Sequence, residues 1–340
     1  MAKDIDWANL GFSYMRTDCH VQAEFRDGAW GDLEVCREPV MQLHIAATCM
    51  HYGQACFEGL KAFGRKDGSV ALFRPLENAR RLANSAKRLV MQPVPEELVV
   101  EACRQVVRLN RDYVPPYGTG ASLYIRPFLV GTTPRIGLKA AEEYTFVVLC
   151  TPMGPYYKEG FSPVKAYVQE RYDRAAPRGV GHVKAAGNYA AGMMGDMEAK
   201  EKGYPICLYL DPEQHRYIDE FGTSNFIGIT ADGRYVTPDS ASVLPSITNK
   251  SLQTIAEEFG MAVERRRVQV TELKSFAEVG ACGTAVVITP VHSILHGETL
   301  YSFGAEDRAG ETLTRLYRQI TGIQYGEIED RYGWMVGIDD

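Results

Sequence analysis

The sequence predicts an α/β (α+β) protein with two domains. Its 340 residues are long for one hydrophobic core and comfortable for two. Segments with helical periodicity occur along the chain beside short apolar runs that are typical of buried strands. A stretch rich in glycine and aromatic residues near residue 155 interrupts this pattern. We therefore expect a small N-terminal α/β domain over residues 1–155, a linker over 156–162 and a large C-terminal α/β domain over 163–340.

The composition is that of an ordinary globular protein and argues against several other classes. Apolar residues make up 45% and charged residues 24% of the sequence, unlike the composition of disordered chains. A net charge of −6 argues against a nucleic-acid partner, because such binding needs a concentrated basic face. No apolar run of about 18 residues occurs, and the first residues carry charge where a signal peptide needs an apolar stretch. We expect a cytoplasmic protein without membrane contacts.

The cysteines and histidines show no disulfide or metal signature. The eight cysteines form no C-x-x-C pair and several lie in apolar runs, so we expect buried, reduced thiols. His292 and His296 are four residues apart, but Pro290 and Gly297 flank them and no acidic ligand pattern accompanies them. The sequence therefore predicts no metal site.

The first domain is expected to combine two helices with apolar strands. Alanine and leucine residues at helical spacing predict a helix over residues 78–90, and a second helix is expected over 95–112. Arg81 falls roughly opposite the apolar stripe of the first helix, where an arginine is normally solvated. Apolar runs at 121–131 and 144–150 predict two strands.

Arg126 lies inside the first of these apolar runs. A guanidinium buried without a partner is very costly, so Arg126 needs either a structural acid or an anionic ligand. The residues alone leave both possibilities open.

The second domain is expected to mix strands and helices. The predicted elements are a helix over 188–203, an antiparallel meander over 206–238, a helix within 244–260, a strand over 263–270, a short helix over 273–279, a strand over 284–291 and a last helix around 313–320. The first amides of the helix within 244–260, near Ile247 and Thr248, would be free donors suited to a phosphate. Many helices begin this way without binding anything, so this signal is weak by itself.

Lys184 lies among small residues in the stretch HVKAAGNY, from His182 to Tyr189. A protonated, hydrated amine is no nucleophile, and crowded or desolvated surroundings would lower its pKa toward the working range. Small neighbours also let a flat ligand approach the backbone closely. Because most lysines are solvated surface residues, this local pattern does not assign a catalytic role alone.

Several separated motifs together resemble those of the branched-chain amino-acid aminotransferases, which are class IV aminotransferases of fold type IV and depend on pyridoxal 5'-phosphate. The motifs are HYGQACFEGLKAF from His51 to Phe63, Tyr124-x-Arg126, HVKAAGNY with Lys184, and YIDEFGTSN with Glu220. They agree in order and spacing, which is far more specific than any one of them. The resemblance covers residues 51–334 and implies a two-domain fold like that of D-amino-acid aminotransferase.

The resemblance implies pyridoxal 5'-phosphate as cofactor and gives a candidate for each contact that it needs. Lys184 would bind the cofactor covalently and move a proton during the reaction. Glu220 would pair with the ring nitrogen, although an isolated glutamate near a turn would be merely solvated. Tyr189 would lie near the cofactor. The implied phosphate contacts are Arg81, Ile247, Thr248 and Thr284.

The same resemblance implies the substrate contacts. Tyr124 and Arg126 match the family's Y-x-R, and Thr284 and Ala285 fall where the family binds the substrate α-carboxylate. The further substrate contacts are Tyr52, Phe57, Leu138 and Tyr156. Because Tyr52 and Leu138 would reach into a neighbouring subunit, a homodimer or a higher homo-oligomer is implied.

The implied activity is transamination of branched-chain L-amino acids (leucine, isoleucine, valine) with 2-oxoglutarate, giving branched-chain 2-keto acids and L-glutamate. Two alternatives of the same fold are a D-amino-acid transaminase and aminodeoxychorismate lyase. Tyr52, Tyr124 and Arg126 favour the branched-chain L-enzyme. A small-molecule-binding protein or a catalytically silent relative is a further alternative, against which the presence of all the chemical residues argues.

Overall fold

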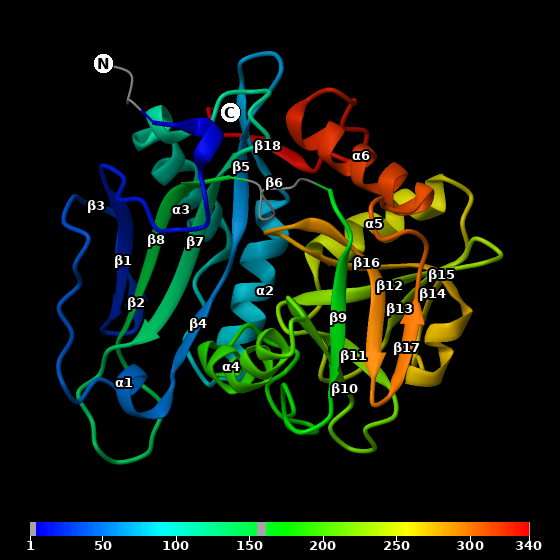
Figure 1. The fold of residues 1–340 in the computed structure, drawn as a ribbon. Helices are drawn as coiled ribbons and strands as arrows, with labels where there is room; N and C mark the ends of the chain where they lie inside the picture. Colours follow the sequence, from blue (N-terminus) through cyan, green and yellow to red (C-terminus); the bar gives the residue numbers. More distant parts are fainter. Residues whose placement is uncertain (1–4, 155–160, 340) are drawn as a thin grey trace. The chain divides into compact units, whose positions relative to one another are not determined.

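The structure, a computed structural model, describes residues 5–154 and 161–339 (Figure 1). Contacts between residues divide the chain into two units. Unit 1 comprises Met1–Lys158, Val183–Gly187 and Gly322–Asp340, and unit 2 comprises Glu159–His182 and Asn188–Thr321. Most of the linker expected over 156–162 lies outside the described residues.

Unit 1 contains a nine-stranded sheet in which all pairings between described strands are antiparallel. The strand order is β18-β6-β5-β7-β8-β1-β2, with β3 paired to β1 and β4 paired to β7. The strands are β1 His20–Arg26, β2 Ala29–Trp30, β3 Glu34–Cys36, β4 Ala55–Phe57, β5 Leu60–Gly64, β6 Val70–Phe73, β7 Ser122–Gly131, β8 Tyr144–Met153 and β18 Met335–Gly337. The chain's last described strand thus completes the sheet that its first strands begin.

The core of unit 1 lies between this sheet and two helices, α2 (Pro75–Arg88) and α3 (Glu96–Leu109). In β7, buried residues alternate with half-buried ones, so Leu123 and Ile125 join the core while Tyr124 and Arg126 project from the opposite face. The two helices predicted for this domain are confirmed as α2 and α3, and the two predicted strands as β7 and β8, within a few residues at their ends. The remaining helical segments of unit 1 are α1 (Thr48–Tyr52), η1 (Trp7–Asn9) and η2 (Arg111–Tyr113).

Unit 2 has a second nine-stranded sheet, with the order β11-β10-β9-β16-β15-β12-β13-β14 and β17 paired to β16. An additional pairing between β11 and β12 closes six of these strands into a ring. The strands are β9 Val164–Gln169, β10 Ile206–Leu210, β11 Ile218–Phe221, β12 Ser224–Thr230, β13 Tyr235–Pro238, β14 Val263–Arg266, β15 Phe276–Gly283, β16 Val287–His296 and β17 Thr299–Ser302. The antiparallel meander predicted over 206–238 is confirmed as β10 to β13.

The helices after residue 185 are α4 (Ala186–Glu201), α5 (Ile247–Glu258), η3 (Val270–Ser275) and α6 (Glu311–Tyr325). The short helix predicted over 273–279 is wrong, because the 3-10 helix ends at Ser275 and β15 begins at the next residue. Phe276 and Val279 pack into the core of the sheet, and this burial overrides the local helical spacing. Within the described residues, no helix combines the length and the apolar character that crossing a membrane requires.

Candidate active site

The F-E-G of the first motif is Phe57, Glu58 and Gly59 in unit 1, and each of these residues makes a different contact. The Phe57 ring lies 4.7 Å from the Arg126 guanidinium carbon and 4.8 Å from Lys184 Nζ, measured to the ring centroid. Glu58 is fully buried. At Gly59 a Cβ atom would collide with the Tyr124 hydroxyl, so glycine is needed for this close approach. The motif therefore assembles one face of the site.

Glu58 and Arg81 form a bidentate ion pair. Arg81 Nε donates to Glu58 Oε1 at 2.7 Å, and Arg81 Nη2 donates to Oε2 at 2.8 Å. The Asn78 amide donates to the same carboxylate at 2.7 Å. Burial alone would raise the pKa of Glu58, but the charge and hydrogen bonds of Arg81, with smaller effects of Lys184 and Asn78, hold this pKa below its ordinary value.

Arg81 is therefore not the solvated residue that helical periodicity predicts. Its side chain is only 12% exposed, and its buried partner Glu58 lies in the short connection between β4 and β5. Its assignment as a phosphate contact stays a prediction, and the carboxylate fixes the direction in which the guanidinium points.

The backbone of Lys184 is fixed on both sides. Phe57 N–H donates to the Lys184 carbonyl at 3.1 Å, and Cys56 forms an antiparallel bridge with Ala185. From helix α2, the Ser85 hydroxyl accepts the Lys184 N–H at 3.0 Å and donates to the Arg81 carbonyl at 3.0 Å. The backbone of Lys184 is thereby attached to α2, which carries Arg81, and to β4, which directly precedes Glu58.

Tyr124 and Arg126 lie side by side on the open face of β7. Arg126 Nη2 donates to the Tyr124 hydroxyl at 2.8 Å. Arg126 Nε is buried and has no hydrogen-bond partner among the residues that the structure describes. Of the two possibilities open at Arg126, no structural acid pairs with it within the described part of the chain, so an anionic ligand is favoured.

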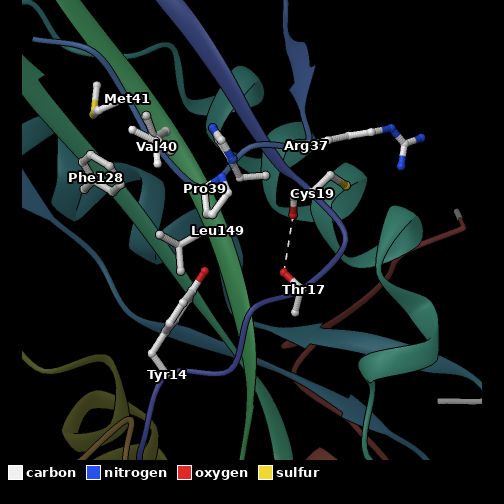
Figure 2. A pocket seen from close by; sticks show the side chains of 11 residues that line it. Tyr14, Thr17, Cys19, Arg37, Pro39, Val40, Met41, Phe128 and Leu149 are labelled. Carbon is white, nitrogen blue, oxygen red and sulfur yellow. Dashed lines mark hydrogen bonds between the residues drawn. The ribbon is translucent and has the colours of Figure 1, made fainter. Parts of the chain in front are cut away.

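A largely apolar pocket of about 270 Å³ continues this face of the unit 1 sheet. Its lining includes Tyr14, Val40, Met41, Phe128, Val147 and Leu149 (Figure 2). In the β7–β8 register, Phe128 lies opposite Val147, and Arg126 lies opposite Leu149. Because alternate residues of a strand share a face, the pocket and Arg126 occupy the same side of the sheet.

Tyr52, the last residue of α1, and Leu138, in the loop between β7 and β8, lie on two segments of unit 1 that hydrogen bonds connect. The Tyr52 hydroxyl donates to the Ile136 carbonyl, and Arg135 N–H donates to the Ala46 carbonyl at 2.8 Å. Ile136 is 73% and Leu138 84% exposed. Apolar side chains that are so exposed need a covering partner or face water.

Unit 2 holds Glu220 as a buried carboxylate on β11. It accepts hydrogen bonds from Asn225 Nδ2 at 2.7 Å and from Leu244 N–H at 3.2 Å, and Arg174 Nη2 lies 2.8 Å from its Oε1. Burial raises the pKa of Glu220, while Arg174 and the two hydrogen bonds oppose this effect. Glu220 is thus not the solvated glutamate that its position near a turn would suggest.

The start of α5 is joined to this carboxylate by a chain of amides. Asn249 Nδ2 donates to Asn225 Oδ1 at 3.1 Å, and Asn225 in turn donates to Glu220. The Ser246 side chain caps α5 by accepting the Asn249 N–H. Ile247 and Thr248 form the first turn, where backbone N–H groups favour an anion.

The other predicted residues lie as follows. Thr284 and Ala285 form the turn between β15 and β16, next to Cys282, which pairs in register with Asn225. Tyr189 is half-buried on α4. Tyr156 falls outside the described residues. No group of histidine, cysteine or acidic side chains suited to a metal ion occurs in 5–154 and 161–339.

The structure therefore gathers the predicted residues in two sets. Unit 1 brings together Phe57, Arg81, Tyr124, Arg126 and Lys184, and unit 2 brings Glu220 to the start of α5. Two further residues, Glu58 and Arg174, were not singled out from the sequence. Glu58 had a weak signal, as the acid of an otherwise apolar motif, whereas Arg174 lies in the charged stretch QERYDRAAPRG and had none.

Residues 55–294 match the family described as amino-transferase class IV. This chain belongs to the class IV aminotransferases. It is 48% identical to the branched-chain-amino-acid aminotransferase of Haemophilus influenzae, over 99% of this chain and 100% of that protein.

Solved structures agree with this assignment and confirm the predicted fold class. The branched-chain amino acid aminotransferase of Escherichia coli superposes with a TM-score of 0.78 at 28% identity, over 95% of this chain and 100% of the other. The T.th. branched-chain amino acid aminotransferase, solved with pyridoxamine 5'-phosphate, gives a TM-score of 0.80 at 26% identity, over 96% and 100%. This aminotransferase therefore shares the two-unit fold of that group.

Replacing Glu58 by glutamine should lower the free energy of unfolding of unit 1 by about 3–5 kcal/mol, because the Arg81 guanidinium would stay buried without its counter-charge. All three tryptophans, Trp7, Trp30 and Trp334, belong to unit 1, so tryptophan fluorescence in urea follows this unit. Added pyridoxal 5'-phosphate should raise the melting temperature of Glu58→Gln less than that of wild type, since Arg81 would no longer be held in the direction that suits the phosphate.

The matched control is Glu101→Gln, because Glu101 also pairs with an arginine, Arg108, but in solvent. This variant should unfold at nearly the wild-type urea concentration. Equal effects of the two substitutions would contradict a special role of the buried pair.

Proposed function

We propose that this aminotransferase transfers the amino group of branched-chain L-amino acids to 2-oxoglutarate, giving branched-chain 2-keto acids and L-glutamate. The observation that carries the proposal is the buried, unpartnered Nε of Arg126 in the unit that holds Lys184. An anionic group is the chemistry that completes such a guanidinium, and the Phe57 ring beside it is apolar. The relatives described above are branched-chain aminotransferases, which favours this activity over a D-amino-acid transaminase or aminodeoxychorismate lyase.

The cofactor is pyridoxal 5'-phosphate, and the residues present fit it. Unit 1 offers the Lys184 amine and Arg81, and unit 2 offers the buried Glu220 carboxylate and the first amides of α5, at Ile247 and Thr248. When bound, this cofactor supplies an electron sink for the negative charge that develops at Cα of the amino acid. We assign its binding to Arg81, Lys184, Tyr189, Glu220, Ile247, Thr248 and Thr284.

Each of these side chains has a defined task in the proposed reaction. Lys184 Nζ would bind the cofactor and would take the proton from Cα of the amino acid. Glu220 holds a proton on the ring nitrogen through a charge-assisted hydrogen bond. Arg81, oriented by Glu58, neutralises phosphate charge, and the turn at Thr284 and Ala285 binds the substrate α-carboxylate.

The substrate side chain must be either apolar or acidic, because leucine and glutamate use the same site in turn. We assign the apolar wall to the ring faces of Phe57, Tyr52, Tyr156 and Tyr189 together with Leu138. The γ-carboxylate of glutamate needs a cation or several donors, since burying it without partners would cost several kcal/mol. Arg126 and the Tyr124 hydroxyl provide these donors.

Lys184 should be the residue that binds the cofactor covalently. Borohydride reduction of the enzyme loaded with pyridoxal 5'-phosphate, followed by peptide mapping, should label Lys184, and a label on another lysine would disprove the assignment. Lys184→Ala should keep some cofactor non-covalently but lose turnover, because the covalent bond and the proton transfer disappear together. Lys66→Ala, at another lysine of unit 1, is the control and should keep both.

Arg126→Met should weaken the use of glutamate and 2-oxoglutarate more than that of leucine and its keto acid. We expect a selective loss of about 1.5–3 kcal/mol, the scale of a hydrogen bond to a charged group. The measurement is kcat/KM for each half-reaction.

Arg80→Met is the matched control, because Arg80 is exposed and pairs with Glu77 and Glu96 on the surface. This variant should keep the wild-type kcat/KM for leucine, its keto acid, glutamate and 2-oxoglutarate. Equal losses for leucine and glutamate in Arg126→Met would instead make Arg126 a structural residue, or one that orients Tyr124 and the α-carboxylate.

We further propose that the enzyme is a homodimer, or a higher homo-oligomer, whose subunits exchange Tyr52 and Leu138. Two observations support this proposal. The exposed apolar residues cluster on α1 and on the loop between β7 and β8, which the Tyr52–Ile136 hydrogen bond connects. The apolar pocket beside Phe128 is open on the face of the sheet that carries Arg126. A second copy of the chain would bury both apolar surfaces at once.

Mixing two inactive variants tests this exchange. One variant is Lys184→Ala, and the other combines Tyr52→Ala with Leu138→Ala. A heterodimer then has one site that carries both lesions and one intact site, so an equal mixture after subunit exchange should recover about a quarter of the wild-type activity. No recovery, in a mixture shown to contain heterodimers, would mean that each subunit completes its own site.

A further inference from the structure

Arg174 lies in the loop that precedes Lys184 in the sequence, and it contacts Glu220 directly. Its Nη2 is 2.8 Å from Glu220 Oε1, and the two side chains are only 10% and 5% exposed. The same Nη2 donates to the Gly181 carbonyl at 3.1 Å and to the Ser242 carbonyl. Arg174 thus joins the carboxylate to two loops of unit 2.

The loop is built around this guanidinium. A Cβ atom at Gly181 would lie 2.9 Å from Arg174 Nη2, and it would also collide with the Ser242 carbonyl. Glycine at this position therefore leaves the space that Arg174 occupies. Arg174 is also the charged side chain closest to Glu220 among the ion pairs of the described residues.

We propose that Arg174 is a positioning residue that keeps Glu220 ionised and so directs the proton of the cofactor–carboxylate pair to the ring nitrogen. The inference rests on the function proposed above, in which Glu220 faces that nitrogen. A cation in direct contact with the carboxylate stabilises the ionised carboxylate more than it disfavours a positive charge farther away. Without Arg174, desolvation would favour a neutral Glu220 and an unprotonated ring, which is a poorer electron sink.

Among the described residues, no other titratable group that acts on Glu220 stabilises its ionised form by charge. Asp219 on the same strand is acidic, and its charge opposes ionisation of Glu220. Cys282, on β15, is a buried thiol whose pKa is raised, chiefly by burial, so it stays neutral. Asn225 and the Leu244 N–H are neutral donors. Arg174 is therefore the one cation among the groups that act on this carboxylate in the described residues.

The first test uses the apoenzyme and needs no turnover. A ¹³C NMR titration of glutamate carboxyl carbons, with the Glu220 signal assigned from Glu220→Gln, should give a higher pKa for Glu220 in Arg174→Met than in wild type. Arg174→Lys should restore most of the difference, because it returns the charge. Arg234→Met is the matched control, since Arg234 pairs with Asp232 and Glu264 in the same unit but is exposed. An unchanged Glu220 pKa in Arg174→Met would overturn the inference.

The second test uses the enzyme loaded with cofactor. Turnover of Arg174→Met should be at least about tenfold below wild type at neutral pH, the effect of roughly one pKa unit. It should not recover as the pH rises, because a higher pH removes the proton that the carboxylate and the ring share and does not return it to the ring nitrogen. The double variant Arg174→Met/Glu220→Gln should be no slower than Glu220→Gln, since Arg174 acts only through the carboxylate that Glu220→Gln has already removed.

The outcomes separate this inference from the proposed function. Near wild-type turnover of Glu220→Gln would mean that the function assigned to Glu220 is wrong. A slow Glu220→Gln beside a fast Arg174→Met would overturn only the role of Arg174. A loss in Arg174→Met that adds to that of Glu220→Gln, with the Glu220 pKa unchanged in the NMR titration, would make Arg174 a purely structural connection between loops.

Discussion

The buried ion pair between Glu58 and Arg81 is the constraint on which the arrangement of Arg81 and Lys184 in unit 1 depends. A carboxylate with no exposed surface is tolerated only when its charge is balanced, and here three donated hydrogen bonds from Arg81 and Asn78 provide the balance. Because Arg81 and Ser85 belong to the same helix, and Ser85 holds the Lys184 backbone, the pair also fixes the lysine relative to the helix. Residues of the short sequence F-E-G thus fix the backbone position of Lys184, which lies more than a hundred residues later in the chain.

Unit 2 contains a second buried ion pair, between Glu220 and Arg174. Such pairs are weak evidence for stability, since two hydrophobic residues could fill the space at lower cost. Their value lies in orientation, because a bidentate or multiply bonded guanidinium has few alternative directions. In the proposed enzyme each unit therefore presents one oriented charge, Arg81 for phosphate and Glu220 for the ring nitrogen. The site does not have to organise these groups while the substrate binds.

Much of the fold could be predicted from the sequence, because its signals are local. Alternation in the apolar run around Arg126 identifies the strand, and periodic apolar residues identify α2 and α3. The segment after Leu273 could not be read in this way, since its spacing suits a helix while its side chains are buried in a sheet by partners distant in sequence. Arg126 drew notice from its apolar surroundings alone. Arg81 and Glu220 looked solvated, and only their buried partners show otherwise, because a buried pair leaves no periodic trace in the chain.

The composition of unit 1 from three pieces of chain bears on how the protein emerges from the ribosome. Strand β18, Met335–Gly337, pairs with β6, Val70–Phe73, and Ile338 belongs to the unit 1 core. The edge of β6 therefore stays open until residues 335–337 have been made, for on the order of ten seconds or more after unit 1's first strands appear. The lysine segment Val183–Gly187 likewise joins unit 1 only after synthesis of unit 2 has begun. The sheet of unit 1 is thus completed only after all of unit 2 has been made, and a chain truncated near residue 320 would lack a strand from its first sheet.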